Sequence, residues 1–273
     1  MVVKLEDPPT GSSSSAEGRK SVARDSGSLI INADDWGRER ETTERIRECI
    51  IRGTVSSVSA MVFMEDSVRS AAVGRESGVD AGLHLNLTVP FSAPKCATRL
   101  VEHQEKLIVY LRRNRLAQVI YNPMLARSFQ YVVTAQLDEF LRLYGAPPDR
   151  IDGHHHMHLC ANVWVGKLLP GETVVRRNFS FQPGDKGLCN RIYRRIVDSA
   201  LARRHRLTDY FFPLLPLEPP ERVDRIFSLA HNFVVEVETH PVNPEEYRFL
   251  TGDEIFRWVG DLRIASDFAL RSN

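Results

Sequence analysis

The chain has 273 residues, of which 42% are hydrophobic and 26% charged, as is typical of a globular protein with one large domain or two small ones. Its formal net charge of +1 argues against nucleic-acid binding or membrane-surface binding driven by bulk charge. No apolar run approaches the roughly 18 residues that a membrane span requires, and the four cysteines form no CxxC pair, which indicates a reducing compartment.

Residues 1–28 are rich in serine and glycine and lack the apolar core of an export signal, so we expect a disordered tail and a cytoplasmic enzyme. We expect residues 29–273 to form one domain with a large core. Local basic clusters leave two interpretations open: solvated helix faces, or a binding rim for an anionic substrate such as a phosphorylated or lipid-linked sugar. These clusters are Arg112-Arg113-Asn114-Arg115, Arg176-Arg177, Arg194-Arg195 and Arg203 to Arg206. The sequence is also compatible with a homodimer.

Apolar runs that end in polar residues alternate with amphipathic segments along the chain. In chain order the pattern predicts a strand at 29–31, a helix at 41–52, a strand at 55–63, a helix at 67–77, a strand at 80–88, helices at 105–120 and 129–144, strands at 150–158 and 174–179, a helix at 190–204, a loop at 213–220, a helix at 221–231, a strand at 232–239 and a helix at 251–269. Such alternation indicates a parallel sheet. We expect a TIM-barrel-like (β/α) fold first and an open doubly wound sheet second.

The first polar cluster, Asn32 to Gly37, directly follows a buried strand. The C-terminal ends of parallel strands are where α/β folds place their active sites. Asp34 and Asp35 would point to opposite faces of a regular strand, so both reach one site only if the chain turns there, which Trp36-Gly37 permits. Two interpretations stay open: one metal ligand and one general base, or a helix N-cap and a solvated carboxylate.

The second cluster is the strictly alternating segment Gly82 to Thr88. Three leucines line one face of this strand, and His84, Asn86 and Thr88 line the other. On the inner face of a barrel, His84 is either a metal ligand or a structural histidine.

The third cluster is the run from His154 to His158, which holds four of the chain's 9 histidines. If the segment stays extended, Asp152, His154, His156 and His158 share one face. Buried imidazoles need hydrogen-bond partners, so such a run has little structural rationale and favours metal binding or catalysis.

The fourth cluster, Glu236 to Pro241, ends a valine-rich strand. His240 is either a general acid, whose pKa or orientation Glu236 or Glu238 would set, or a histidine that satisfies a loop carbonyl. All four clusters fall at strand ends or along one strand face. This arrangement would bring them together at one mouth of the sheet.

Five motifs follow one another between residue 29 and about residue 250: NADDWG at 32–37, GTVSSVSAMV at 53–62, GLHLNLT at 82–88, DGHHHMH at 152–158, and Glu236 with His240-Pro241. With these motifs the sequence resembles the YdjC-like carbohydrate deacetylase family, which includes chito-oligosaccharide deacetylase. The resemblance implies a TIM-barrel-like fold and a divalent metal ion. It also implies Asp35, His84 and His154 as metal ligands, Asp34 as catalytic base and His240 as catalytic acid.

One carboxylate and two imidazoles suit zinc, cobalt or manganese, whereas the family is usually described with magnesium, and both alternatives stay open. Asp152, His156, His158 and Glu236 would support the ligands or bind substrate. The family usually has phenylalanine after the aspartate pair. Here Trp36 takes that place and would reshape the pocket floor or a sugar-stacking surface.

The expected reaction removes an N-acetyl group from a carbohydrate that contains an amino sugar and releases acetate. Asp34 would take a proton from water that the metal activates, and His240 would donate one to the leaving amine. Two alternatives are hydrolysis of another amide, ester or phosphoester, and a catalytically silent carbohydrate-binding protein. A single clear metal site disfavours a two-metal phosphoesterase, and the complete set of catalytic residues disfavours a silent protein.

Overall fold

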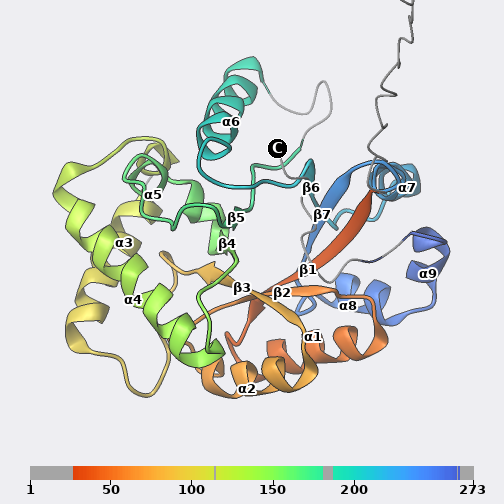
Figure 1. Cartoon of the computed structure of the whole chain (residues 1–273), viewed down its shortest axis with the longest axis horizontal. Coiled ribbons are helices and arrows are strands. Elements are labelled where there is room, and N and C mark those ends of the chain that lie inside the picture. The colour runs from red at the N-terminus through yellow and green to blue at the C-terminus, as the bar shows by residue number, and fades with distance from the viewer. Residues whose placement is uncertain (1–26, 114, 181–186, 263, 265–273) are drawn as a thin grey trace, which may run out of the picture.

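The computed structural model describes residues 27–113, 115–180, 187–262 and 264 (Figure 1). The strands are β1 (Ser28–Trp36), β2 (Ser57–Ala60), β3 (Asp80–Leu85), β4 (Arg150–Gly153), β5 (Val174–Val175), β6 (Tyr210–Pro213) and β7 (Val234–Thr239). The α-helices are α1 (Arg40–Arg52), α2 (Ser67–Ser77), α3 (Thr98–Arg113), α4 (Ala126–Tyr144), α5 (Ala161–Trp164), α6 (Leu188–Leu201), α7 (Pro220–Leu229), α8 (Pro244–Thr251) and α9 (Glu254–Val259). Short 3-10 helices are η1 (Arg115–Gln118), η2 (Pro123–Leu125) and η3 (His154–Leu159). The tail predicted for residues 1–28 lies outside the described residues except for its last two.

The strands form one 7-stranded parallel sheet in the order β5-β4-β3-β2-β1-β7-β6. Apart from β5 and β6, strands that succeed one another in the chain are neighbours in the sheet; β1 pairs with β7, and β5 and β6 are the two edges. This is the strand order of a (β/α) barrel with a seam between β5 and β6. Backbone hydrogen bonds cross that seam from Val175 to Arg206 (2.9 Å) and from Ser180 to Phe211 (2.8 Å). The predicted parallel α/β sheet is confirmed, and it is curled without closing.

The two faces of the sheet differ in chemistry because strand side chains alternate. Aliphatic residues such as Ile31 and Val237 pack in the hydrophobic core beneath the helices. Residues between them, such as Asn32, Asp34 and Glu236, are polar and equally buried, on the face that the curled sheet encloses. The outer face of the sheet is therefore apolar and packs against the helices. The inner face is polar and can form a site.

Amphipathic helices surround the sheet (Figure 1). Helix α4, expected at 129–144, buries Phe129, Val132 and Phe140 on one side, and each such side chain contributes about 1.5–3 kcal/mol relative to exposure. Gly145 ends this helix with a φ of 81°, a conformation that glycine adopts without steric cost. Within the part of the chain that the structure describes, no helix is long and apolar enough to cross a membrane.

The structure differs most clearly from the prediction at three places. Strand β6 occupies Tyr210–Pro213, where no strand was expected, and it pairs with β7 along its whole length. The strand predicted at 150–158 ends at Gly153, because the left-handed backbone of His155 (φ 54°) and His156 (φ 57°) turns the chain into η3. The helix predicted at 251–269 is replaced by α8 and α9, which are separated at Gly252, and residues 263 and 265–269 lie outside the described residues.

Candidate metal and active site

Asp34 and Asp35 reach the same enclosed site although they are neighbours in β1. The register between β1 and β2 shifts between Ala33 and Trp36, and Asp35 has a φ of 67°. Aspartate enters this left-handed region more readily than most residues with a side chain. The turn that allows both carboxylates to face one site is therefore present.

Asp35, His84 and His154 converge from β1, from β3 and from the turn after β4. Asp35 Oδ1 lies 2.9 Å from His154 Nδ1 and 3.4 Å from His84 Nε2. All three residues are at most 5% exposed. Among the described residues, Asp35 Oδ1 and His84 Nε2 have no hydrogen-bond partner, although buried polar atoms are rarely left without one. One oxygen and two imidazole nitrogens within 4.8 Å of one another fit a divalent cation.

Asp152 orients His84 from behind. Its Oδ1 lies 2.7 Å from His84 Nδ1, and its Oδ2 accepts a hydrogen bond from Arg150 at 3.1 Å. A Cβ atom on Gly82 would lie 2.7 Å from the Arg150 guanidinium carbon, so only glycine leaves room for this contact. Burial disfavours the imidazolium form of His84, but Asp34 and Asp152 outweigh it and raise the pKa of His84 to about 10 in the metal-free protein. A metal ion at Nε2 would therefore compete with a proton.

Arg176 is the centre of a buried ionic network that the sequence did not reveal. Its guanidinium donates two hydrogen bonds to Asp34, at 2.7 and 2.8 Å, and its Nε donates to Glu236 at 2.7 Å. Asp152 Oδ2 lies 3.0 Å from Nη2, and Glu238 Oε1 lies 3.3 Å from Nη1. Arg176 is only 1% exposed and lies inside the curled sheet. It therefore lies neither on a solvated helix face nor on a rim that binds an anionic substrate.

The network sets the charge of the carboxylates. Burial opposes ionisation of Asp34, but Arg176 and His84 outweigh it and hold the pKa of Asp34 well below its usual range. Burial and the charge of Asp34 raise the pKa of Glu238 well above its usual range. Asp34 is therefore an ionised carboxylate with a fixed orientation, and Glu238 favours its protonated form.

His240 stands at the mouth of the site, after the end of β7. Its side chain is 37% exposed, and its Nε2 lies 4.0 Å from Asp34 Oδ2. Glu236 and Glu238 were expected to orient it, but Glu236 binds Arg176. Glu246, which the sequence analysis did not single out, accepts a hydrogen bond from the His240 backbone N–H at 2.5 Å. Glu246 therefore fixes the backbone that carries the imidazole.

The histidines after His154 point in different directions, because the segment is a turn and not a strand. The segment does not stay extended, so the condition under which alternate histidines would share one face is not met. Their neighbours are Thr88 Oγ1 at 3.0 Å from His155 Nδ1, Glu238 Oε2 at 3.8 Å from His156 Nε2, and the Arg176 carbonyl at 2.9 Å from His158 Nε2. Burial lowers the pKa of His158 to about 4, so its neutral ring donates to this carbonyl and helps to place Arg176.

A cavity of about 410 Å³ adjoins the site, and its lining includes His155, His156, Phe179 and Tyr193. Phe179 stacks on Phe211 with a centroid distance of 4.6 Å and contacts the His156 ring at its edge. These rings give the cavity an aromatic wall. Trp36 does not contribute to this wall, because its side chain is 0% exposed and packs in the core.

Comparisons with known proteins identify relatives of this chain. The family model described as YdjC-like protein matches residues 28–259. A chitooligosaccharide deacetylase of Proteus mirabilis is 32% identical over 139 residues, which cover 50% of this chain and 52% of the relative. A carbohydrate deacetylase of Clostridium beijerinckii is 24% identical over 216 residues, covering 78% of this chain and 80% of the relative. The match thus spans about half the length of the Proteus relative.

A solved structure shares the fold. The crystal structure of a putative cellobiose-phosphate cleavage protein from Enterococcus faecalis superposes with a TM-score of 0.63 at 18% identity, covering 90% of this chain and all of that one. At this identity the likeness concerns the fold alone. The match of the family model over most of the chain shows that this protein belongs to the YdjC-like family.

Proposed function

We propose that this protein is a metal-dependent hydrolase that removes an N-acetyl group from a carbohydrate containing an amino sugar, with acetate as the second product. One observation carries the proposal. The ionised carboxylate of Asp34 and the imidazole of His240 lie side by side, next to a buried three-residue cluster that suits a metal ion. The names of the relatives, which are deacetylases of chito-oligosaccharides or carbohydrates, support the same substrate class.

Asp35, His84 and His154 would hold one divalent metal ion. The two buried atoms without a hydrogen-bond partner, Asp35 Oδ1 and His84 Nε2, would then both be satisfied. The two imidazoles favour zinc, cobalt or manganese, whereas the family resemblance favours magnesium. When bound, such an ion polarises an acyl carbonyl, lowers the pKa of water and stabilises negative charge on oxygen.

Asp34 is the proposed general base. Arg176 keeps it ionised and holds both of its oxygens in place. Its Oδ2 lies 3.8 Å from His84 Nε2 and 4.0 Å from His240 Nε2, so the proton acceptor borders both the ligand cluster and the proton donor. A base in this position would take a proton from the water that attacks the acetamide carbon.

His240 is the proposed general acid. An amide nitrogen leaves as an amine only when it receives a proton, and an imidazolium at the open mouth can supply one. Because His240 is partly exposed, it can exchange its proton with solvent between turnovers. Asp34 and His240 would therefore act on the same reacting group, Asp34 as proton acceptor and His240 as proton donor.

The cavity beside the site is the proposed place for the sugar. Phe179 offers an aromatic surface to a pyranose ring, and the side chains of Asn178, Asn190 and Tyr193 offer hydrogen bonds to hydroxyl groups. We further propose that the protein works as one TIM-barrel-like domain, in which the seam between β5 and β6 lies on the side of this cavity.

Acetate release from a panel of N-acetylated sugars tests the proposal, with N-acetylglucosamine oligomers first. The matched variant is Asp34→Asn, which keeps the size of the side chain and removes the base. We expect wild-type protein to release acetate. Asp34→Asn should bind metal but lose about 10²–10⁴-fold in kcat, the usual contribution of a general base. Hydrolysis by Asp34→Asn at the wild-type rate would show that the base is assigned wrongly.

A further inference from the structure

Helix α6 turns an apolar stripe toward solvent. Leu188, Ile192 and Ile196 are spaced four residues apart, so they lie along one face of the helix. Their exposed fractions are 69%, 49% and 56%. Single exposed aliphatic residues are common on protein surfaces, but three in one row on one helix mark a contact surface.

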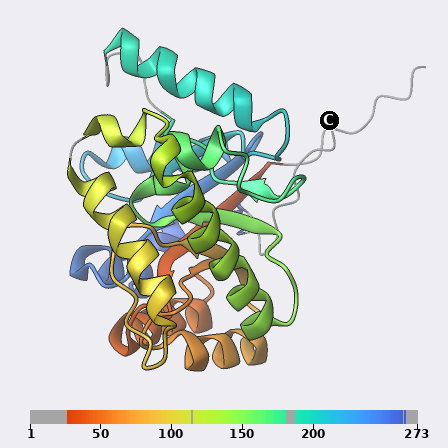
Figure 2. The same cartoon turned by 90° about the vertical axis from the view of Figure 1, so that its left-hand side faces the viewer.

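The opposite side of α6 already has partners. Val197 and Leu201 are buried against the body of the protein, and Asn190 and Tyr193 line the cavity beside the active site. The helix lies along the outer edge of the molecule in both views (Figures 1 and 2). The apolar stripe therefore faces away from the core, on a helix that borders the mouth of the proposed substrate cavity.

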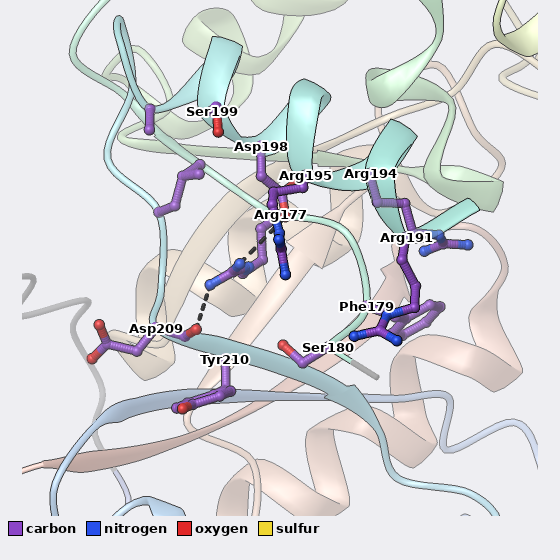
Figure 3. Close-up of a pocket in the computed structure, with 12 residues that line it drawn as sticks. Arg177, Phe179, Ser180, Arg191, Arg194, Arg195, Asp198, Ser199, Asp209 and Tyr210 are labelled. Carbon is purple, nitrogen blue, oxygen red and sulfur yellow. Dashed lines mark hydrogen bonds and ion pairs between the residues drawn. The ribbon is translucent and has the colours of Figure 1, made fainter. Parts of the chain in front are cut away.

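The same segment concentrates positive charge. Residues 188–206 contain six arginines and one carboxylate, Asp198, in a chain whose net charge is only +1. Arg191 and Arg195 are exposed, and their side chains make no hydrogen bond or ion pair with any other described residue. They flank the apolar stripe on the side of a cavity of about 540 Å³, which Arg177 lines from across the gap (Figure 3).

The positive charge of this surface and its small apolar area indicate which kind of partner it binds. A two-fold dimer through this face would place the arginines of both copies against one another, and three aliphatic side chains fall far short of the roughly 800 Å² per partner that a stable interface buries. Residues 1–26 offer no complementary charge, because their four basic side chains are balanced by four acidic ones. An anionic lipid surface satisfies both features, since it accepts aliphatic side chains and attracts arginines.

We propose that α6 docks this protein on an anionic lipid surface, with Leu188, Ile192 and Ile196 inserted at the level of the headgroups and Arg191 and Arg195 bound to lipid phosphates. The cavity in Figure 3 gives a headgroup phosphate room beside Arg191 and Arg195, whereas Arg177 in its wall is already bonded to Asp198 and to the backbone carbonyls of Thr208 and Asp209. The proposal does not rest on the proposed reaction.

Vesicle co-sedimentation tests it, with the full chain and two kinds of vesicle: phosphatidylcholine alone, and phosphatidylcholine mixed with phosphatidylglycerol. We expect binding to the anionic vesicles, weakened by salt, and little binding to the neutral ones. Ile192→Ser with Ile196→Ser should weaken binding by about tenfold or more, because burial of each isoleucine is lost. Arg191→Gln with Arg195→Gln should weaken it by about fivefold per arginine.

Helix α3 offers matched controls, because Val109 is 70% exposed and Arg112 and Arg113 are exposed on a helix other than α6. Val109→Ser, and Arg112→Gln with Arg113→Gln, should bind vesicles like the wild type. Thermal unfolding of every variant checks that it is folded, and light scattering gives its oligomeric state. Equal binding to both vesicle types, or α6 variants that stay folded and bind like the wild type, would overturn the proposal. So would conversion of an oligomer to a monomer by the isoleucine variant without loss of vesicle binding, which would identify an interface between copies.

Discussion

Replacement of Arg176 by methionine is the sharpest test of the buried network. The substitution keeps much of the aliphatic volume and removes a guanidinium that contacts Asp34, Asp152, Glu236 and Glu238. Removal of one partner of a buried ion pair costs about 3–5 kcal/mol, because the other charge stays buried without compensation. For a protein of this size, such a loss in the free energy of unfolding corresponds to a fall in Tm of roughly 6–20 °C.

Thermal unfolding followed by circular dichroism measures this effect, with Arg142→Met as the matched control. Arg142 is 61% exposed and pairs with Glu139 on the surface of α4, so its replacement should change the free energy of unfolding by less than about 1 kcal/mol. If Arg176→Met lowers Tm no more than Arg142→Met does, the reasoning about the network is refuted.

The difference in Tm between wild type and Arg176→Met should change with pH in a direction that follows from the carboxylate pKa values. Burial opposes the ionisation of Asp34 and Asp152, but Arg176 outweighs it; the pKa of Asp34 lies well below its usual range and that of Asp152 falls to about 2. A carboxyl whose pKa is lowered on folding stabilises the folded state above its unfolded pKa, and this stabilisation is lost as pH falls toward the folded pKa. The difference in Tm between metal-free wild type and Arg176→Met should therefore be largest near neutral pH and should narrow below about pH 4.

Two further predictions concern the groups around the ligand cluster. Asp152→Asn should weaken metal affinity by about 10–100-fold, because it removes the negative charge that orients His84; isothermal titration with the metal ion measures it, and unchanged affinity would contradict this role. Phe179→Ala should raise KM for the sugar and leave kcat within a few-fold, because the aromatic wall binds the sugar and takes no part in proton transfer; a large fall in kcat at constant KM would speak against this assignment.

The convergence of the candidate ligands could be predicted from the sequence because it follows from topology. Asp35, His84 and His154 sit at or near the C-terminal ends of three parallel strands, and those ends meet at one edge of the sheet. The alternation of Gly82 to Thr88 also places His84 on the face opposite the leucines, as in the structure. Hydrophobic periodicity and strand order therefore predict that these clusters meet, whereas the choice of Asp35, His84 and His154 among their residues rests on the family resemblance.

The role of Arg176 could not be predicted, because it depends on partners far away in sequence. Its bond to Asp34 joins residues 142 positions apart, and the local pattern Arg176-Arg177 looks like a surface cluster. Strand β6 was missed since Tyr210–Pro213 has no clear alternation and ends in proline, which is typical of a loop or a sheet edge. The turn at His155 and His156 needs left-handed backbone at two successive residues other than glycine, and no sequence signal marks it.

The most direct test of the central claim is a metal titration of the purified protein, with acetate release measured at each step. Protein stripped by a chelator should release no acetate from its N-acetylated substrate, and one equivalent of a divalent ion per chain should restore activity. His154→Ala should bind the ion far more weakly and stay inactive while it remains folded. Full activity of the chelated wild type, or tight stoichiometric metal binding by His154→Ala, would contradict the claim that Asp35, His84 and His154 form the metal site of a deacetylase.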